Sequence, residues 1–180
     1  MAHIEQREFF TAMSERFPEY FRWCNVLEVG SLNINGTVRD FFSNCNYVGV
    51  DVGSGPGVDV VAYGENLTYN NDSFDVAVSA ECFEHNPEWK ATFINMARMT
   101  HGLVMFTCAT WGRPEHGTTR TDPGSSPLTA NWDYYQNLEA GDFTVGCDLD
   151  EMFDEYQFST NTASHDLYFW GITKGVKDDK

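Results

Sequence analysis

The sequence predicts an α/β domain: a mostly parallel, Rossmann-like β-sheet with helices on both faces. From Val26 to Cys108, apolar strand segments alternate with helical or turn segments in the order strand, helix, strand, loop, strand, loop, strand, helix, strand. The first strand ends in Gly30 and a polar turn that leads into a helix. A strand, a tight turn and a helix in this order are typical of a nucleotide-binding corner.

The composition is that of a single domain over residues 1–180, with 42% hydrophobic and 15% aromatic residues. There are 11 basic and 27 acidic residues, a formal net charge of −16. This balance argues against nucleic acid or an anionic membrane as a partner. No apolar run resembles a signal peptide or a membrane span, and the five cysteines include no C-x-x-C pair. We therefore expect reduced thiols and a cytoplasmic location.

Residues 1–22 are expected to form a leading helix, which would pack on the sheet or lie over the ligand pocket. Pro18 ends its pattern of apolar residues. These residues recur at the spacing of one helix face: Ile4, Phe9, Phe10, Met13 and Phe17.

Two further helices are expected within the sheet region. The first runs from about Thr37 to Ser43. The second begins with Asn86 as its N-cap and Pro87 in its first turn, and it ends near Gly102. Strands are expected at residues 26–29, 47–51, 58–61, 74–79 and 103–108, followed by a closing antiparallel pair at 157–161 and 166–173.

Residues with chemical potential fall at the carboxyl ends of the strands, where ligands bind on parallel sheets. Asp51 lies about 20 residues beyond the glycine turn, the position of an acid that accepts hydrogen bonds from ribose hydroxyls. The alternative is that it bonds only its local backbone. Glu28 places a negative charge where a pyrophosphate would be repelled, so it favours a cationic ligand. Glu81 and His85 follow the fourth strand in the same way.

Residues 109–143 form a long segment that is expected to be a substrate or lid loop. It combines Trp111 with charged residues, among them Arg113, Glu115 and His116. Four aromatic residues would form the pocket for the second substrate, or would simply cover the sheet: Trp111, Trp132, Tyr134 and Tyr135.

Four segments together resemble the class I S-adenosylmethionine-dependent methyltransferases over essentially the whole chain: Val26–Gly30, Tyr47–Asp51, Phe74–His85 and 167–173. The resemblance implies a seven-stranded sheet with an antiparallel last strand, and S-adenosyl-L-methionine as the cofactor. The sulfonium and ammonium groups of that cofactor account for an acid at Glu28.

The resemblance also implies a set of cofactor-binding residues. Asp51 would hold the ribose, the segment with Tyr63 would flank adenine, and Glu81 would lie beside the methyl group. The full set is Glu28, Gly30, Ser31, Asp51, Val52, Tyr63, Gly64, Ala80 and Glu81. The sequence departs from the family pattern in two places. The glycine-rich motif is incomplete, and Tyr63 stands near a position where many members carry an acid.

The function implied is methyl transfer to a small-molecule acceptor, on an oxygen atom. An oxygen nucleophile usually loses a proton, and a histidine is suited to accept it near neutral pH. His85 and His116 are the candidate catalytic residues, although each could instead have a structural or surface role. No metal is expected, because nothing in the sequence fixes a ligand set around Glu81, His85 and His116. The alternative is a non-catalytic methyltransferase-fold protein that serves as a binding or interaction module, while Glu28 disfavours an NAD-binding domain.

Overall fold

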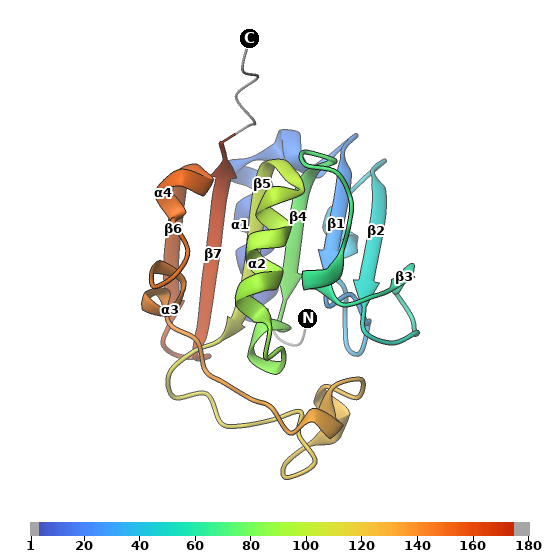
Figure 1. Cartoon of the computed structure of the whole chain (residues 1–180), viewed down its shortest axis with the longest axis vertical. Coiled ribbons are helices and arrows are strands. Elements are labelled where there is room, and N and C mark those ends of the chain that lie inside the picture. Colours follow the sequence, from blue (N-terminus) through green and yellow to red (C-terminus); the bar gives the residue numbers. More distant parts are fainter. Residues whose placement is uncertain (1–3, 175–180) are drawn as a thin grey trace.

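The computed structural model describes residues 4–174. Its seven strands form one sheet in the order β3-β2-β1-β4-β5-β7-β6 (Figure 1). Strands β1 to β5 pair in parallel, and β7 runs antiparallel to both β5 and β6. The predicted fold class, including the antiparallel last strand, is confirmed. The strands are β1 (Asn25–Val29), β2 (Asn46–Asp51), β3 (Val60–Val61), β4 (Phe74–Ala80), β5 (Thr100–Ala109), β6 (Phe153–Asn161) and β7 (Asp166–Thr173).

Helices cover both faces of the sheet. Helix α1 (Ile4–Arg16) lies behind it in Figure 1, whereas α2 (Trp89–Arg98), α3 (Ala140–Thr144) and α4 (Leu149–Met152) lie in front. Within residues 4–174, no helix combines the length and apolar character needed to cross a bilayer. Short 3₁₀ helices occupy Pro18–Phe21, Val38–Phe41, Gly64–Asn66, Phe83–His85, Pro123–Ser125 and Ala130–Trp132.

The alternation of side chains along the strands divides the apolar residues into two cores. In β1, Val26 packs in the core that contains Phe10 of α1, and Leu27 packs in the core that contains Phe93 of α2. All four side chains are fully buried. Because successive strand residues point to opposite faces, a continuous apolar run in the sequence indicates a strand that is covered on both sides.

The helix expected from about Thr37 to Ser43 is only a single 3₁₀ turn, Val38–Phe41. Thr37 caps this turn by accepting a hydrogen bond from the Arg39 N–H at 3.1 Å. The turn ends at Phe42, whose backbone is extended (φ −99°, ψ 133°), and Phe41 packs against Phe10 of α1 with ring centroids 5.8 Å apart. Tertiary packing thus overrides the local pattern.

The boundaries of α2 also differ from the prediction. The helix begins at Trp89, and Asn86 accepts a hydrogen bond from the Glu88 N–H at 2.8 Å before the helix starts. Gly102 lies inside β5 rather than at a helix end. A Cβ atom at this position would lie 2.4 Å from the Asp75 carbonyl oxygen, so close packing between strands accounts for the glycine.

Candidate functional site

A cavity of about 410 Å³ lies at the carboxyl ends of the strands, next to the long loop that follows β5. Figure 1 shows this loop crossing below the ends of β1, β2 and β4. We call its two sides the strand-end wall and the loop wall. The strand-end wall is drawn from residues 29–35, 51–52, 62–65 and 80–86, and the loop wall from residues 113–116 and 125–132.

The turn after β1 brings the backbone close to the cavity. Gly30 has a φ of +83°, and its N–H donates to the Val50 carbonyl at 2.9 Å. A Cβ atom on Gly30 would lie 2.5 Å from the Cβ of Cys82, so only glycine fits this position. Ser31 is buried behind the turn and is not among the cavity-lining residues.

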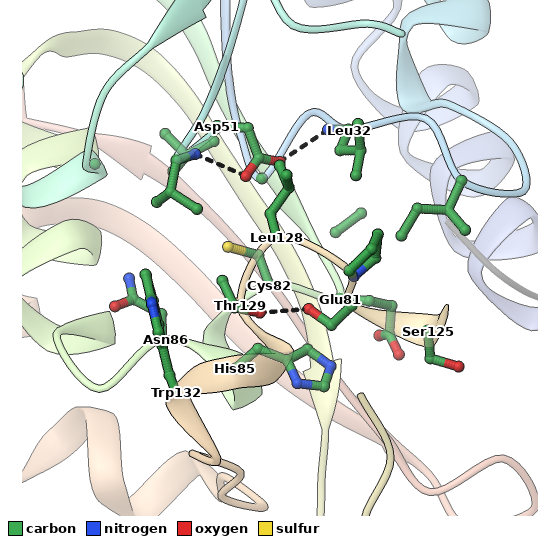
Figure 2. A pocket seen from close by; sticks show the side chains of 18 of the residues that line it. Leu32, Asp51, Glu81, Cys82, His85, Asn86, Ser125, Leu128, Thr129 and Trp132 are labelled. Carbon is green, nitrogen blue, oxygen red and sulfur yellow. Dashed lines mark hydrogen bonds between the residues drawn. The ribbon is translucent and has the colours of Figure 1, made fainter. Parts of the chain in front are cut away.

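Asp51 at the end of β2 lines the cavity and is fixed by its own backbone surroundings. One carboxylate oxygen accepts a hydrogen bond from the Leu32 N–H at 2.9 Å, and the other accepts from the Val52 N–H at 2.8 Å (Figure 2). Burial raises the pKa of this carboxyl group. Each carboxylate oxygen can accept more than one hydrogen bond. Asp51 therefore bonds the local backbone and keeps acceptor capacity for a ligand.

Glu28 does not line the cavity. Its side chain is buried and accepts a hydrogen bond from the Tyr47 hydroxyl at 2.9 Å. Strand alternation puts Glu28 on the same face of β1 as Val26, toward α1. Burial raises the pKa of Glu28 to about 7. The sequence predicts that this acid faces the ligand, whereas its side chain is buried on the face of β1 that packs against α1. Its contact with a cofactor stays a prediction.

The exit from β4 has an unusual backbone. Glu81 has a φ of +52°, a left-handed conformation that costs free energy in a residue with a side chain. Its Oε1 accepts a hydrogen bond from the Thr107 hydroxyl at 3.2 Å, and its Oε2 lies 3.7 Å from Nη2 of Arg113. The 3₁₀ helix Phe83–His85 follows at once. The turn thereby brings His85 into the cavity wall, and Glu84 is fully buried beside it.

Four side chains meet there, and we call them the inner cluster: Glu84, His85, His116 and Tyr135. The ring centroid of His85 lies 4.9 Å from that of His116 and 5.5 Å from that of Tyr135. Glu84 accepts a hydrogen bond from the Ala109 N–H through Oε1 at 3.2 Å. Three buried atoms of the cluster have no hydrogen-bond partner among the described residues: Glu84 Oε2, His85 Nδ1 and Tyr135 Oη.

Burial controls the charge of the inner cluster. It raises the pKa of Glu84 well above its ordinary value, and the nearby carboxylate of Glu81 adds to this effect. Burial also lowers the pKa of His85 to about 3, with a smaller contribution from His116. At neutral pH, His85 is therefore a neutral imidazole with a nitrogen lone pair available.

The long loop is attached to the domain by both charged and backbone contacts. Arg113 pairs through Nη1 with Oδ1 of Asp166 in β7 at 2.8 Å, and Gln136 donates its N–H to the Glu84 carbonyl at 2.9 Å. Further out, Nη2 of Arg120 lies 2.7 Å from Oε1 of Glu115. These contacts hold His116 and Tyr135 against the exit of β4.

The predicted aromatic pocket is only partly formed. Trp132 lines the cavity and stacks with Tyr63, with ring centroids 6.1 Å apart and an interplanar angle of 18°. Tyr135 belongs to the inner cluster. Trp111 is 75% exposed, and neither it nor Tyr134 is among the cavity-lining residues.

Most of the other predicted site residues meet in this one cavity. It brings together His85 and His116 with seven of the residues expected to bind the cofactor: Gly30, Asp51, Val52, Tyr63, Gly64, Ala80 and Glu81. Sequence reasoning gave no role to Glu84, although a signal was present. Glu81, Glu84 and His85 stand close together directly after a strand, but only the observed turn shows that all three approach the site.

Comparison with known proteins finds similarity to methyltransferases. Residues 32–105 match a family model described as a methyltransferase domain. This match and the shared fold agree with the resemblance to the S-adenosylmethionine-dependent methyltransferases. Two of the structural neighbours described below hold S-adenosylhomocysteine or S-adenosyl-L-methionine. The comparison with curated proteins found no match.

Solved structures share the fold at low sequence identity. One is the 1,6-didemethyltoxoflavin-N1-methyltransferase from Burkholderia thailandensis, with S-adenosylhomocysteine bound (12% identity, TM-score 0.61, 93% of this chain and 77% of that chain). Another is the YcgJ protein from Bacillus subtilis (12% identity, TM-score 0.61, 93% of this chain and 99% of that chain). A third is phosphoethanolamine N-methyltransferase 2 from Haemonchus contortus, in complex with S-adenosyl-L-methionine (14% identity, TM-score 0.61, 92% of this chain and 52% of that chain).

Proposed function

We propose that this protein transfers the methyl group of S-adenosylmethionine to an oxygen atom of a small-molecule acceptor. The observation that carries the proposal is Asp51, which is fixed by two backbone N–H groups and faces the cavity beside Gly30. A carboxylate in this position can accept hydrogen bonds from both ribose hydroxyls of the cofactor. In this proposal the adenine lies near Tyr63 and Trp132.

The methyl group then lies toward Ala80 and Glu81, and the acceptor approaches from the loop wall. Methyl transfer depends mainly on aligning the two reactants and excluding water. His85 and His116 line this part of the cavity and remain the proposed catalytic residues, because their ring nitrogens can hydrogen-bond to an acceptor hydroxyl. Glu28 and Ser31 support the first turn from outside the cavity.

The size of the cavity limits the acceptor to a small molecule, because the same cavity must also hold the cofactor. Ligand pockets usually enclose about 300–1,000 Å³, and the volume of about 410 Å³ is near the lower end of that range. Two of the structural neighbours are named for small-molecule substrates, and both methylate nitrogen. The attacked atom is therefore the part of the proposal that most needs an assay with matched hydroxyl and amine acceptors.

Calorimetric titration with S-adenosylmethionine and S-adenosylhomocysteine tests the cofactor site. We expect both to bind the wild type, and Asp51→Ala to weaken binding at least about tenfold, because hydrogen bonds to a charged group are lost. Asp75→Ala is the matched control, since Asp75 lies at the opposite end of the sheet, near the start of β4. A folded wild type that binds neither compound would overturn the proposal and favour the non-catalytic alternative.

A further inference from the structure

We propose that Glu84, His85 and His116 form a binding site for a divalent transition-metal ion at the inner end of the cavity. Each of the three side chains offers one ligand atom, and these atoms all lie within 4.8 Å of one another. His85 and His116 also line the cavity, so an ion can reach the site from solvent. Two imidazoles and one carboxylate form a common ligand set for such ions.

Unpartnered atoms in the site independently indicate a missing ligand. Glu84 is 0% exposed and His85 is 4% exposed, yet Oε2 of the first and Nδ1 of the second have no hydrogen-bond partner among the described residues. A buried polar atom without a hydrogen-bond partner destabilises the folded state. The ionised form of Glu84 offers lone pairs at Oε2, and the Nε2–H tautomer of His85 offers one at Nδ1, so one cation that displaces the carboxyl proton can satisfy both atoms.

Hydrogen bonds with neighbouring groups fix the orientation of the His116 and Glu84 side chains, as they do for the ligating residues of known metal sites. Nδ1 of His116 donates to the Pro114 carbonyl oxygen at 3.1 Å, which leaves the proton on Nδ1 and the lone pair on Nε2. Oε1 of Glu84 accepts from the Ala109 N–H at 3.2 Å, which fixes the carboxyl plane. Ligating histidines usually donate their other ring N–H to a carbonyl or a carboxylate.

The charges around the site allow a cation. The carboxylate of Glu81, which lies 3.7 Å from the Arg113 guanidinium, adds negative charge beside the site. Arg113 also faces the cluster and opposes a cation, but its guanidinium is paired with Asp166 at 2.8 Å and lies 3.7 Å from Glu81. The local balance of these neighbouring charged groups is therefore negative.

The ligand types favour transition metals over magnesium or calcium. Imidazole nitrogen suits zinc, iron, cobalt and related ions, whereas magnesium and calcium prefer an all-oxygen environment. The sequence alone fixed no ligand set around His85 and His116. The structure supplies the third ligand, Glu84, which the backbone turn at Glu81 brings to the two histidines.

The position of the ion has a chemical consequence that rests on the proposed function. The site lies on the side of the cavity where the acceptor is expected to bind. With the ion bound, His85 and His116 would act on the acceptor through the ion, in place of direct hydrogen bonds from their ring nitrogens. A cation there would lower the pKa of an acceptor hydroxyl that approached it and would orient its oxygen.

Metal binding is measured on untagged protein that has been stripped with a chelator, without S-adenosylmethionine, so that the result is independent of methyl transfer. We expect calorimetry to show one Zn²⁺ per chain, and Co²⁺ to give a visible spectrum with nitrogen and oxygen ligation. His116→Gln should lower the Zn²⁺ affinity at least tenfold and abolish the Co²⁺ spectrum. His101→Gln is the matched control, because His101 pairs with Asp75 near the opposite end of β5.

Glu84→Gln gives a second test, since glutamine can still accept the Ala109 N–H but is a poor metal ligand. We expect it to weaken Zn²⁺ binding as His116→Gln does, in protein whose circular dichroism matches that of the wild type. The proposal is overturned if the folded wild type binds no Zn²⁺ or Co²⁺, or binds only Mg²⁺. It is equally overturned if His116→Gln binds Zn²⁺ as tightly as the His101→Gln control.

Discussion

The two walls of the cavity are built on different principles. On the strand-end wall the backbone determines the geometry: Gly30 turns where only glycine fits, and both oxygens of Asp51 are held by N–H groups. On the loop wall the geometry depends on side-chain pairs such as Arg113 with Asp166, and three polar atoms of the adjoining inner cluster have no partner among the described residues. The strand-end wall suits a ligand whose shape is always the same, such as a cofactor. The loop wall suits a ligand that can differ between related proteins, such as the acceptor.

Removing the buried charge of the loop wall should have the largest effect. The side chains of Arg113 and Asp166 are only 18% and 0% exposed, so Arg113→Met leaves a buried carboxylate without its cation. We expect a loss of about 3–5 kcal/mol in the free energy of unfolding, measured by urea denaturation. In protein that remains folded, affinity for S-adenosylhomocysteine should be nearly unchanged. A parallel loss of that affinity would show that the two walls are not independent.

Gly30→Ala damages the strand-end wall instead. Its φ of +83° and the contact with Cys82 should cost about 2–4 kcal/mol of stability and remove measurable cofactor binding. Gly141→Ala is the control, since an added Cβ there has no atom within 4 Å. If Gly30→Ala bound S-adenosylhomocysteine as the Gly141→Ala control does, the close backbone approach would have no role in binding.

Glu28, which is buried next to the strand-end wall, should make the free energy of unfolding depend on pH. Its folded-state pKa of about 7 exceeds the ordinary 4.5, so the folded protein holds an extra proton between these values. The contribution of Glu28 therefore becomes less favourable to folding as the pH rises through this range. From pH 5 to pH 8, the unfolding free energy of Glu28→Gln should rise relative to the wild type by up to about 3 kcal/mol. The exposed control Glu8→Gln should follow the wild type throughout.

Arg120 provides the smallest expected effect. It is 51% exposed in its pair with Glu115, and exposed pairs contribute about 0–1 kcal/mol. Arg120→Gln should therefore change the melting temperature little. A destabilisation as large as that of Arg113→Met would mean that the outer part of the loop, and not only its buried anchor, holds the loop wall in place.

The sequence was sufficient to predict those features that follow from the regular alternation of side chains along a strand and from the turns at strand ends. Apolar strands covered on both faces, the turn at Gly30 and the acid at Asp51 together predicted the sheet and most of the strand-end wall. The direction of Glu28 was missed because a strand side chain takes one of two faces, and here the buried face includes its partner Tyr47. The sequence indicated His85, His116 and Tyr135 but not Glu84, because the meeting of the four side chains depends on a left-handed turn at Glu81, for which the sequence carries no glycine signal.

The central claim is that the strand-end wall binds S-adenosylmethionine through Asp51. The most direct measurement is a crystal structure of the protein with S-adenosylhomocysteine. Our account predicts both ribose hydroxyls within hydrogen-bond distance of the Asp51 carboxylate, and the sulfur atom turned toward Ala80 and Glu81. A ribose held elsewhere, with Asp51 bonded only to its backbone neighbours, would contradict it.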